Sequence, residues 1–173
     1  DPELLGSRTP IDMEFFYIDI ASVAEGILSF PEARIRFRDA PSRARKCVKR
    51  GDVLMSTVRP NLKAFVCFDR RIRDVVASTG FAVIRPKANA DAHFIYHSLL
   101  SDDVTAQIRQ RAVGSSYPAI NTKDVAALLL NAPLKDEQTA IARILDTVDE
   151  SIRQTAAVIE KLKKIKTGLL HDL

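Results

Sequence analysis

The sequence lacks tryptophan, has only two cysteines and contains no run of apolar residues long enough to cross a membrane. Cys47 and Cys67 stand in strand-like surroundings without the spacing of a metal-binding pair, so we expect reduced thiols in a cytoplasmic protein with no membrane partner. With 173 residues, 46% of them hydrophobic, the chain is long enough to bury the core of one domain and carry an appendage.

Recognisable catalytic motifs are missing as well. The sequence has no glycine-rich dinucleotide or phosphate loop, no serine nucleophile elbow and no zinc-deaminase signature. His93 and His97 are four residues apart on a predicted helix and could approach one metal ion, but no third ligand is evident, which favours a core or surface role. We therefore predict no catalytic residues, no metal site and no cofactor in this chain.

Negative charge is scarce in one part of the chain. Between Arg34 and Arg73 there are 13 Lys or Arg against three Asp, a net charge of +10 in a chain whose total is +4. Because each neutralised phosphate releases condensed counterions, such a segment is typical of proteins that bind a polyanion. The alternative is a solvated basic face without a ligand.

Short strands and loops are predicted in the first half of the chain. Residues 15–24 fit a strand and a turn, and residues 34–38 fit a strand with Ile35 and Phe37 on one side and arginines on the other. Residues 40–50 are polar and fit a loop or a short turn of helix. Beyond Gly51, four further strands are predicted over residues 53–57, 62–68, 75–79 and 81–86.

The hydrophobic period changes in the second half. Residues 91–103 and 104–112 fit two short helices divided near Ser101, and residues 113–121 fit a loop. Asn121 or Thr122 can cap a further short helix.

A long helix is predicted from Asp136 onward, because apolar residues recur there at alternating steps of four and three. Such a helix extends roughly 50 Å, so its apolar stripe needs a partner helix. The alternative is a helix folded entirely onto its own domain. The residues predicted to pair with another helix are Ile141, Leu145, Val148, Ile152, Ile159, Leu162 and Leu169.

Polar and basic side chains in the strand and loops are candidate DNA contacts. Arginine can bind guanine and asparagine can bind adenine through two hydrogen bonds, whereas serine, lysine and tyrosine favour phosphates. Asn61 could instead be a turn former and Asn121 a helix cap. The predicted contacts are Arg34, Arg36, Arg38, Ser42, Arg43, Arg45, Lys46, Arg59, Asn61, Lys63, Ser115, Ser116, Tyr117, Asn121 and Lys123.

Four stretches, residues 40–66, 77–87, 114–121 and 137–173, resemble the specificity subunit of Type I restriction–modification enzymes. The resemblance runs from about Phe15 to Leu173. It implies a target-recognition domain that reads one half of a split DNA sequence, and a spacer helix that packs antiparallel against a second long helix. It also implies docking of methyltransferase subunits, which bind S-adenosylmethionine, and of a motor-nuclease restriction subunit.

The sequence departs from that family in one respect. Relatives usually carry two recognition domains and two spacer helices, whereas this sequence has one of each. We therefore expect either a half-subunit that dimerises or one recognition unit of a longer protein.

We predict an α+β fold, with a mixed or antiparallel β-rich target-recognition domain with short helices over residues 1–134 and a long coiled-coil-type helix over residues 135–173. The predicted function is sequence-specific binding of double-stranded DNA without catalysis by this chain. The alternatives are a protein–protein adaptor that uses the long helix, and a DNA methyltransferase or nuclease that acts alone.

Overall fold

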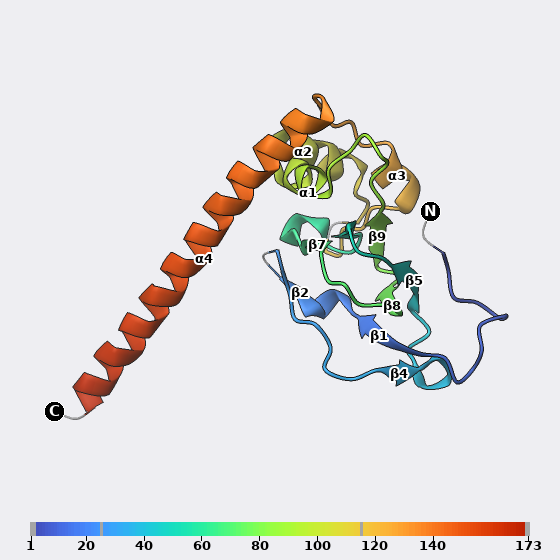
Figure 1. Ribbon diagram of the computed structural model, residues 1–173, viewed down its shortest axis with the longest axis horizontal. Helices are drawn as coiled ribbons and strands as arrows, with labels where there is room; N and C mark the ends of the chain where they lie inside the picture. The colour runs from blue at the N-terminus through green and yellow to red at the C-terminus, as the bar shows by residue number, and fades with distance from the viewer. Residues whose placement is uncertain (1–2, 25, 115, 172–173) are drawn as a thin grey trace.

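The computed structural model describes residues 3–24, 26–114 and 116–171, which form a domain of short strands and helices with one long protruding helix (Figure 1). The predicted α+β class is confirmed. The strands are β1 (Glu14–Ile18), β2 (Val23–Ala24), β3 (Ile27–Leu28), β4 (Ile35–Arg36), β5 (Ala44–Val48), β6 (Asp52–Ser56), β7 (Phe65–Phe68), β8 (Val75–Ser78) and β9 (Phe81–Ile84). The helices are α1 (Ala92–Leu100), α2 (Asp102–Arg111), α3 (Thr122–Ala126), α4 (Lys135–His171) and the 3-10 turns η1 (Ile20–Ser22), η2 (Phe37–Asp39) and η3 (Pro60–Leu62).

The strands of the described residues form three sheets. The first has the order β4-β1-β8-β5, in which β1 and β8 are parallel and the other pairs are antiparallel. The second, β7-β6-β9, is antiparallel throughout, and β2 and β3 form a small separate pair. This mixture of parallel and antiparallel pairing is the mixed sheet that the sequence predicts.

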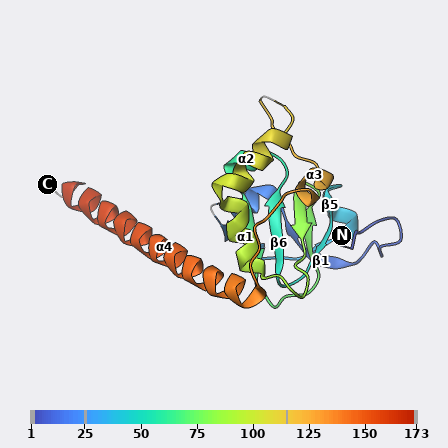
Figure 2. The ribbon, with the colours of Figure 1, turned by 90° about the horizontal axis from the view of Figure 1, so that it is seen from above.

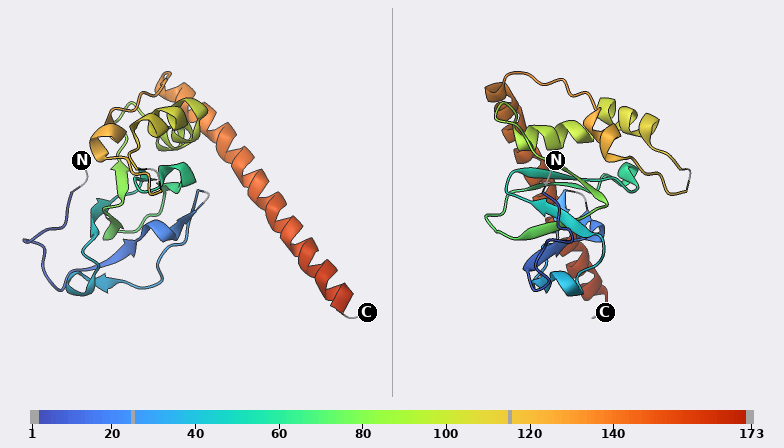
Figure 3. Two further views of the ribbon diagram at one scale, coloured as in Figure 1. Left: turned by 180° about the vertical axis from the view of Figure 1, so that it is seen from behind. Right: turned by 90° about the vertical axis from the view of Figure 1, so that its right-hand side faces the viewer.

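Strand β6 lies at the centre of the domain, and all five of its residues are buried. Leu54 packs with Ile18 and Phe81 between the two larger sheets. Because side chains alternate along a strand, Val53 and Met55 face the other way, where they pack with residues of α1 and α2. Figures 2 and 3 show these two helices over the outer face of the β7-β6-β9 sheet.

Two segments differ from their predicted structure. Residues 40–50 contain β5 rather than only a loop or a helical turn, and the pairing of β5 with β8 has an irregularity between Ala44 and Lys46. Ala44 and Val48 face the core and are buried. The polar side chains of this segment obscure that pattern in the sequence. The predicted strand over residues 34–38 is shorter than expected, because only β4 is extended and η2 follows it.

Helix α4 touches the domain only over its first turns. Gln138 and Ala142 are buried, and the Gln138 side chain donates to the carbonyl of Pro133 at 2.8 Å and accepts from the amide of Asp91 at 3.0 Å. From residue 150 to residue 170 every side chain is exposed, and the helix runs away from the domain (Figures 1 and 2). Across the described residues, no helix combines the length and the hydropathy that a membrane span requires.

Candidate nucleic-acid interface

Two loops that are far apart in the sequence meet at the surface. The amide of Arg59, in the loop after β6, donates to the carbonyl of Pro118 at 2.7 Å. The Arg59 guanidinium lies 3.7 Å from the centre of the Tyr117 ring, and Tyr117 is 64% exposed. A cationic group is therefore held against an exposed aromatic ring, in a geometry that favours the cation.

The backbone of the first loop is strained at two non-glycine residues. Arg59 and Lys63 have φ angles of 47° and 52°, on either side of η3 with its buried Pro60. A left-handed residue of this kind costs about 1 to 2 kcal/mol. The Lys63 ammonium donates to the carbonyl of Leu100 at 3.0 Å, at the C-terminal end of α1, where the helix dipole favours a positive charge. This contact fixes the loop to α1.

The turn between β8 and β9 connects this loop to the start of β5. Both the amide and the hydroxyl of Thr57 donate to the carbonyl of Gly80 at 2.8 Å. The amide of Thr79 donates to the carbonyl of Arg43 at 2.8 Å. Backbone contacts thus join one continuous border of the domain, which we call the loop edge and which consists of residues 42–43, 57–63, 79–80 and 116–118. Its exposed polar residues from the predicted set are Ser42, Arg43, Asn61, Ser116 and Tyr117, together with the partly exposed Arg59.

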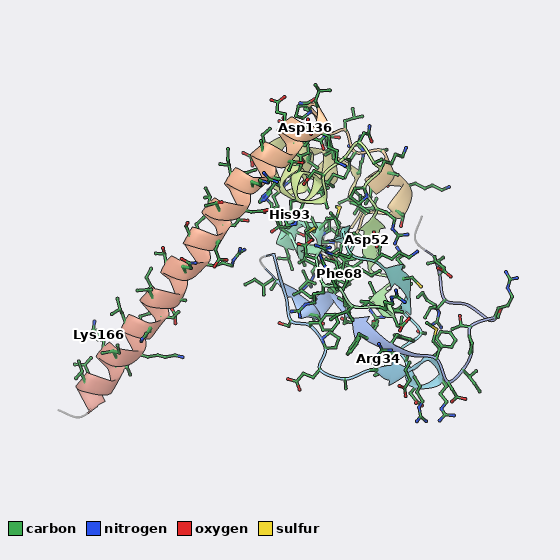
Figure 4. All side chains as sticks on the ribbon, viewed as in Figure 1. Arg34, Asp52, Phe68, His93, Asp136 and Lys166 are labelled. Carbon is green, nitrogen blue, oxygen red and sulfur yellow. The ribbon has the colours of Figure 1, made fainter. Side chains whose placement is uncertain are left out.

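Three predicted arginines lie elsewhere, directly before β4, at the end of β4 and in η2, and each one faces a carboxylate. Arg34 lies 3.2 Å from Asp74, and Figure 4 shows it at the end of the domain opposite Asp136. The corresponding distances are 3.4 Å for Arg36 with Glu14 and 3.0 Å for Arg38 with Asp12. The charges of these three predicted contacts are therefore offset by acids, and the three arginines lie apart from the loop edge. The guanidinium of Arg45, on β5, lies over the ring of Phe37, 5.0 Å from its centre.

The remaining predicted residues have partners within the chain or lie apart from the loop edge. The Lys46 ammonium donates to the carbonyl of Phe81 at 2.5 Å, and burial lowers the pKa of Lys46. Asn121 caps α3 through the amide of Asp124 at 2.8 Å, so the alternative helix-cap role is confirmed. Lys123 is exposed on α3, and Ser115 lies outside the described residues.

A second cationic surface was not among the predicted contacts. A groove of about 1190 Å³ lies between residues 3–10, the end of β5 and the loop after β7. Most of the basic residues that line this groove belong to the strongly basic segment between Arg34 and Arg73. Their arrangement around one groove is visible only in the fold. The basic residues that line it are Arg8, Lys49, Arg50, Arg70, Arg71 and Arg73, accompanied by the acids Glu3 and Asp74.

A polar cluster joins α1, β7 and α4. His93 lies 2.9 Å from Asp69 through Nε2 and 2.9 Å from Asp146 through Nδ1, and His97 lies 2.8 Å from the same Asp146. Hydrogen bonding of the protonated ring to Asp69, and then to Cys67, raises the pKa of His93 to about 11. No third ligand for these histidines is evident in the sequence, but the fold brings Cys67 and Asp69 next to His93.

Comparison with known proteins gives consistent matches over most of the chain. Residues 49–164 match the family described as Type I restriction modification DNA specificity domain. The chain is 32% identical over 138 residues to the Type I restriction enzyme HindI specificity subunit of Haemophilus influenzae, a match that covers 78% of this chain and 30% of that protein.

Two solved structures have the same fold. The HsdS subunit from Thermoanaerobacter tengcongensis superposes with a TM-score of 0.77 and 32% identity, over 90% of this chain and 40% of that one. A chain from a study of complex assembly and conformational transition of the type I R-M system superposes with a TM-score of 0.80 and 30% identity, over 95% of this chain and 43% of that one. This chain therefore spans less than half the length of each of these relatives.

Proposed function

Because this chain belongs to the Type I restriction modification DNA specificity domain family, we propose that it binds duplex DNA sequence-specifically and reads one half of a split target through the loop edge. The observation that carries this proposal is the stacking of Arg59 on Tyr117 at 3.7 Å. A guanidinium confined in this way presents its N–H groups as a fixed fork, which suits O6 and N7 of guanine. Restricting the side chain before binding also reduces the entropy lost on binding.

The residues of the loop edge divide by chemistry into two roles. Arg59 and Asn61 read base edges, since their side chains can make paired hydrogen bonds to guanine and adenine. Ser42, Arg43 and Ser116 contact phosphates, which fix the position of the domain on the duplex. The cationic groove lined by Arg70, Arg71 and Arg73 adds to the positive potential that attracts DNA to the domain.

We also propose that α4 packs against a second long helix and that the paired helices dock methyltransferase subunits and a restriction subunit. This proposal is supported by a stripe of exposed apolar side chains: Leu145 (37% exposed), Val148 (50%), Ile152 (61%), Ile159 (47%), Leu162 (59%) and Leu169 (63%). The stripe continues the face of α4 that packs on the domain, because the buried Gln138 stands seven residues before Leu145 and fourteen before Ile152, at nearly the same angle around the helix. In this arrangement the partner subunits bind S-adenosylmethionine and carry out catalysis, and this chain recognises the DNA sequence.

The first prediction concerns salt. We expect the affinity of the chain for a duplex to fall linearly on a plot of log affinity against log salt, with a slope of about −0.9 for each phosphate neutralised. Fluorescence anisotropy with a duplex selected from a random-sequence pool, repeated at several salt concentrations, measures this slope. An affinity that does not change with salt would contradict DNA binding and favour the adaptor alternative.

The second prediction concerns Arg59. Replacing it with alanine should lower the affinity for the selected duplex about 5- to 150-fold, because a paired hydrogen bond to a base contributes about 1 to 3 kcal/mol of discrimination. The affinity for random duplex should change much less. Arg143→Ala, which removes an exposed arginine on α4, is the matched control and should leave both affinities unchanged. Equal losses on selected and random DNA would show that Arg59 contacts only phosphate.

A further inference from the structure

The cluster beside α4 brings together three different types of metal ligand. Cys67 and Asp69 come from the end of β7 and the residue after it, where side chains two positions apart point to the same side. His93 comes from the first turn of α1 and faces them. The ligand atoms of these three residues all lie within 4.8 Å of one another.

The distances in the cluster are close to those of a tetrahedral zinc site. With bonds of about 2.1 Å to oxygen and nitrogen and about 2.3 Å to sulfur, tetrahedral ligands stand about 3.3 Å apart for an N–O pair and about 3.6 Å apart for an S–O pair. Here His93 Nε2 is 2.9 Å from Asp69 Oδ2, and Cys67 Sγ is 3.9 Å from Asp69 Oδ1. These two distances involve different oxygens of Asp69, but the ligand atoms of the three residues all lie within 4.8 Å of one another, so side-chain adjustments would bring all three groups to one ion.

The surroundings of His93 match those of a metal-binding imidazole. Its Nδ1 is 2.9 Å from Asp146 on α4, which leaves Nε2 directed at Asp69 and Cys67. A histidine that binds a metal usually donates its other ring N–H to a carboxylate in this way. Asp146 also contacts His97 at 2.8 Å, so the orienting carboxylate is itself fixed by α1.

We propose that Cys67, Asp69 and His93 bind one divalent transition-metal ion, for which Zn²⁺ is the best match to a sulfur, nitrogen and oxygen ligand set. The cluster borders a hollow of about 520 Å³ that Tyr96 and Asp149 also line, which leaves room for water as a fourth ligand. Because Asp146 belongs to α4, the bound ion would strengthen the attachment of the long helix to the domain. This site does not depend on DNA recognition.

Cobalt provides the direct test, because a thiolate bound to Co²⁺ gives a charge-transfer absorption band. The 173-residue chain, titrated with Co²⁺ at pH 8, should bind one ion with such a band, and Zn²⁺ should abolish the band by displacing Co²⁺. Asp146→Asn should weaken the binding about 10- to 100-fold while the band persists, since it removes only the orienting carboxylate.

The two cysteines supply a matched pair of variants. Cys67→Ser should eliminate the band, whereas Cys47→Ser, which changes the half-buried cysteine of β5, should retain both band and stoichiometry. Far-UV circular dichroism without metal checks that both variants are folded. Absence of stoichiometric binding to the unsubstituted chain, or a band that survives in Cys67→Ser, would overturn the proposal.

Discussion

Replacing Asp52 with alanine is expected to lower the free energy of unfolding by about 3 kcal/mol, because it removes a buried carboxylate that accepts three hydrogen bonds, and a hydrogen bond to a charged group contributes about 1.5 to 3 kcal/mol. Asp52 is 1% exposed at the start of β6. Its carboxylate accepts hydrogen bonds from Arg85 Nε at 2.8 Å, from Arg85 Nη2 at 2.7 Å and from the amide of Lys49 at 2.7 Å. The substitution leaves the amide of Lys49 without its acceptor and leaves the Arg85 guanidinium, whose side chain is 36% exposed, to water. Urea denaturation followed by circular dichroism gives the change in free energy.

The control for this prediction is an aspartate whose ion pair lies at the surface. Asp12 pairs with Arg38 at 3.0 Å, but its side chain is 67% exposed. An ion pair in that position contributes less than about 1 kcal/mol, so Asp12→Ala should be nearly as stable as the unsubstituted chain. If the two alanine variants lost the same stability, the bidentate contact between Asp52 and Arg85 would not be what holds β6 to the end of β9.

The same contact shows which parts of the fold can be predicted from the sequence. The strands around Asp52 follow a clear alternation or a buried apolar run, and they lie where the pattern predicts them. Strand β5 was missed because its inward-facing Ala44 and Val48 are separated by three polar or weakly apolar residues. Its extended conformation is stabilised by pairing with β8, a tertiary contact that local sequence does not encode.

The candidate site, like the fold, could be predicted only in part from the sequence. Both loops of the interface were predicted to carry polar candidate contacts, and of these Asn61, Ser116 and Tyr117 are exposed. Their meeting through Arg59 and Tyr117 depends on the route of the chain through α1 and α2, which no local pattern reveals. The cluster of Cys67, Asp69 and His93 was missed for the same reason, since its ligands come from a strand and a helix with no shared motif. Charge counting identified the basic segment but not the acids that offset Arg34, Arg36 and Arg38.

The final prediction concerns the exposed stripe of α4. If this face pairs with the same face of a second copy, the 173-residue chain should self-associate, and Ile152→Lys should raise the dissociation constant at least 100-fold. Ile152 is 61% exposed in the single chain, and burying such a side chain contributes about 1.5 to 3 kcal/mol. A symmetric pair loses two of these contributions and must also accommodate two lysines, so the combined effect exceeds about 2.7 kcal/mol, which corresponds to a 100-fold change. Sedimentation velocity over a range of protein concentrations measures the dissociation constant.

Gln154→Lys is the matched control, because it introduces the same side chain two residues away on the same helix. Residues two positions apart lie about 200° apart around a helix, so Gln154 stands nearly opposite Ile152. It is also exposed and bonded only to Glu150 of its own helix, at 2.9 Å, among the described contacts. The control should associate like the unsubstituted chain, since its new charge remains in water and can still pair with Glu150. Equal weakening by both variants would mean that net charge, and not the apolar stripe, controls association, and a chain that stays monomeric at every concentration would rule out pairing between identical copies.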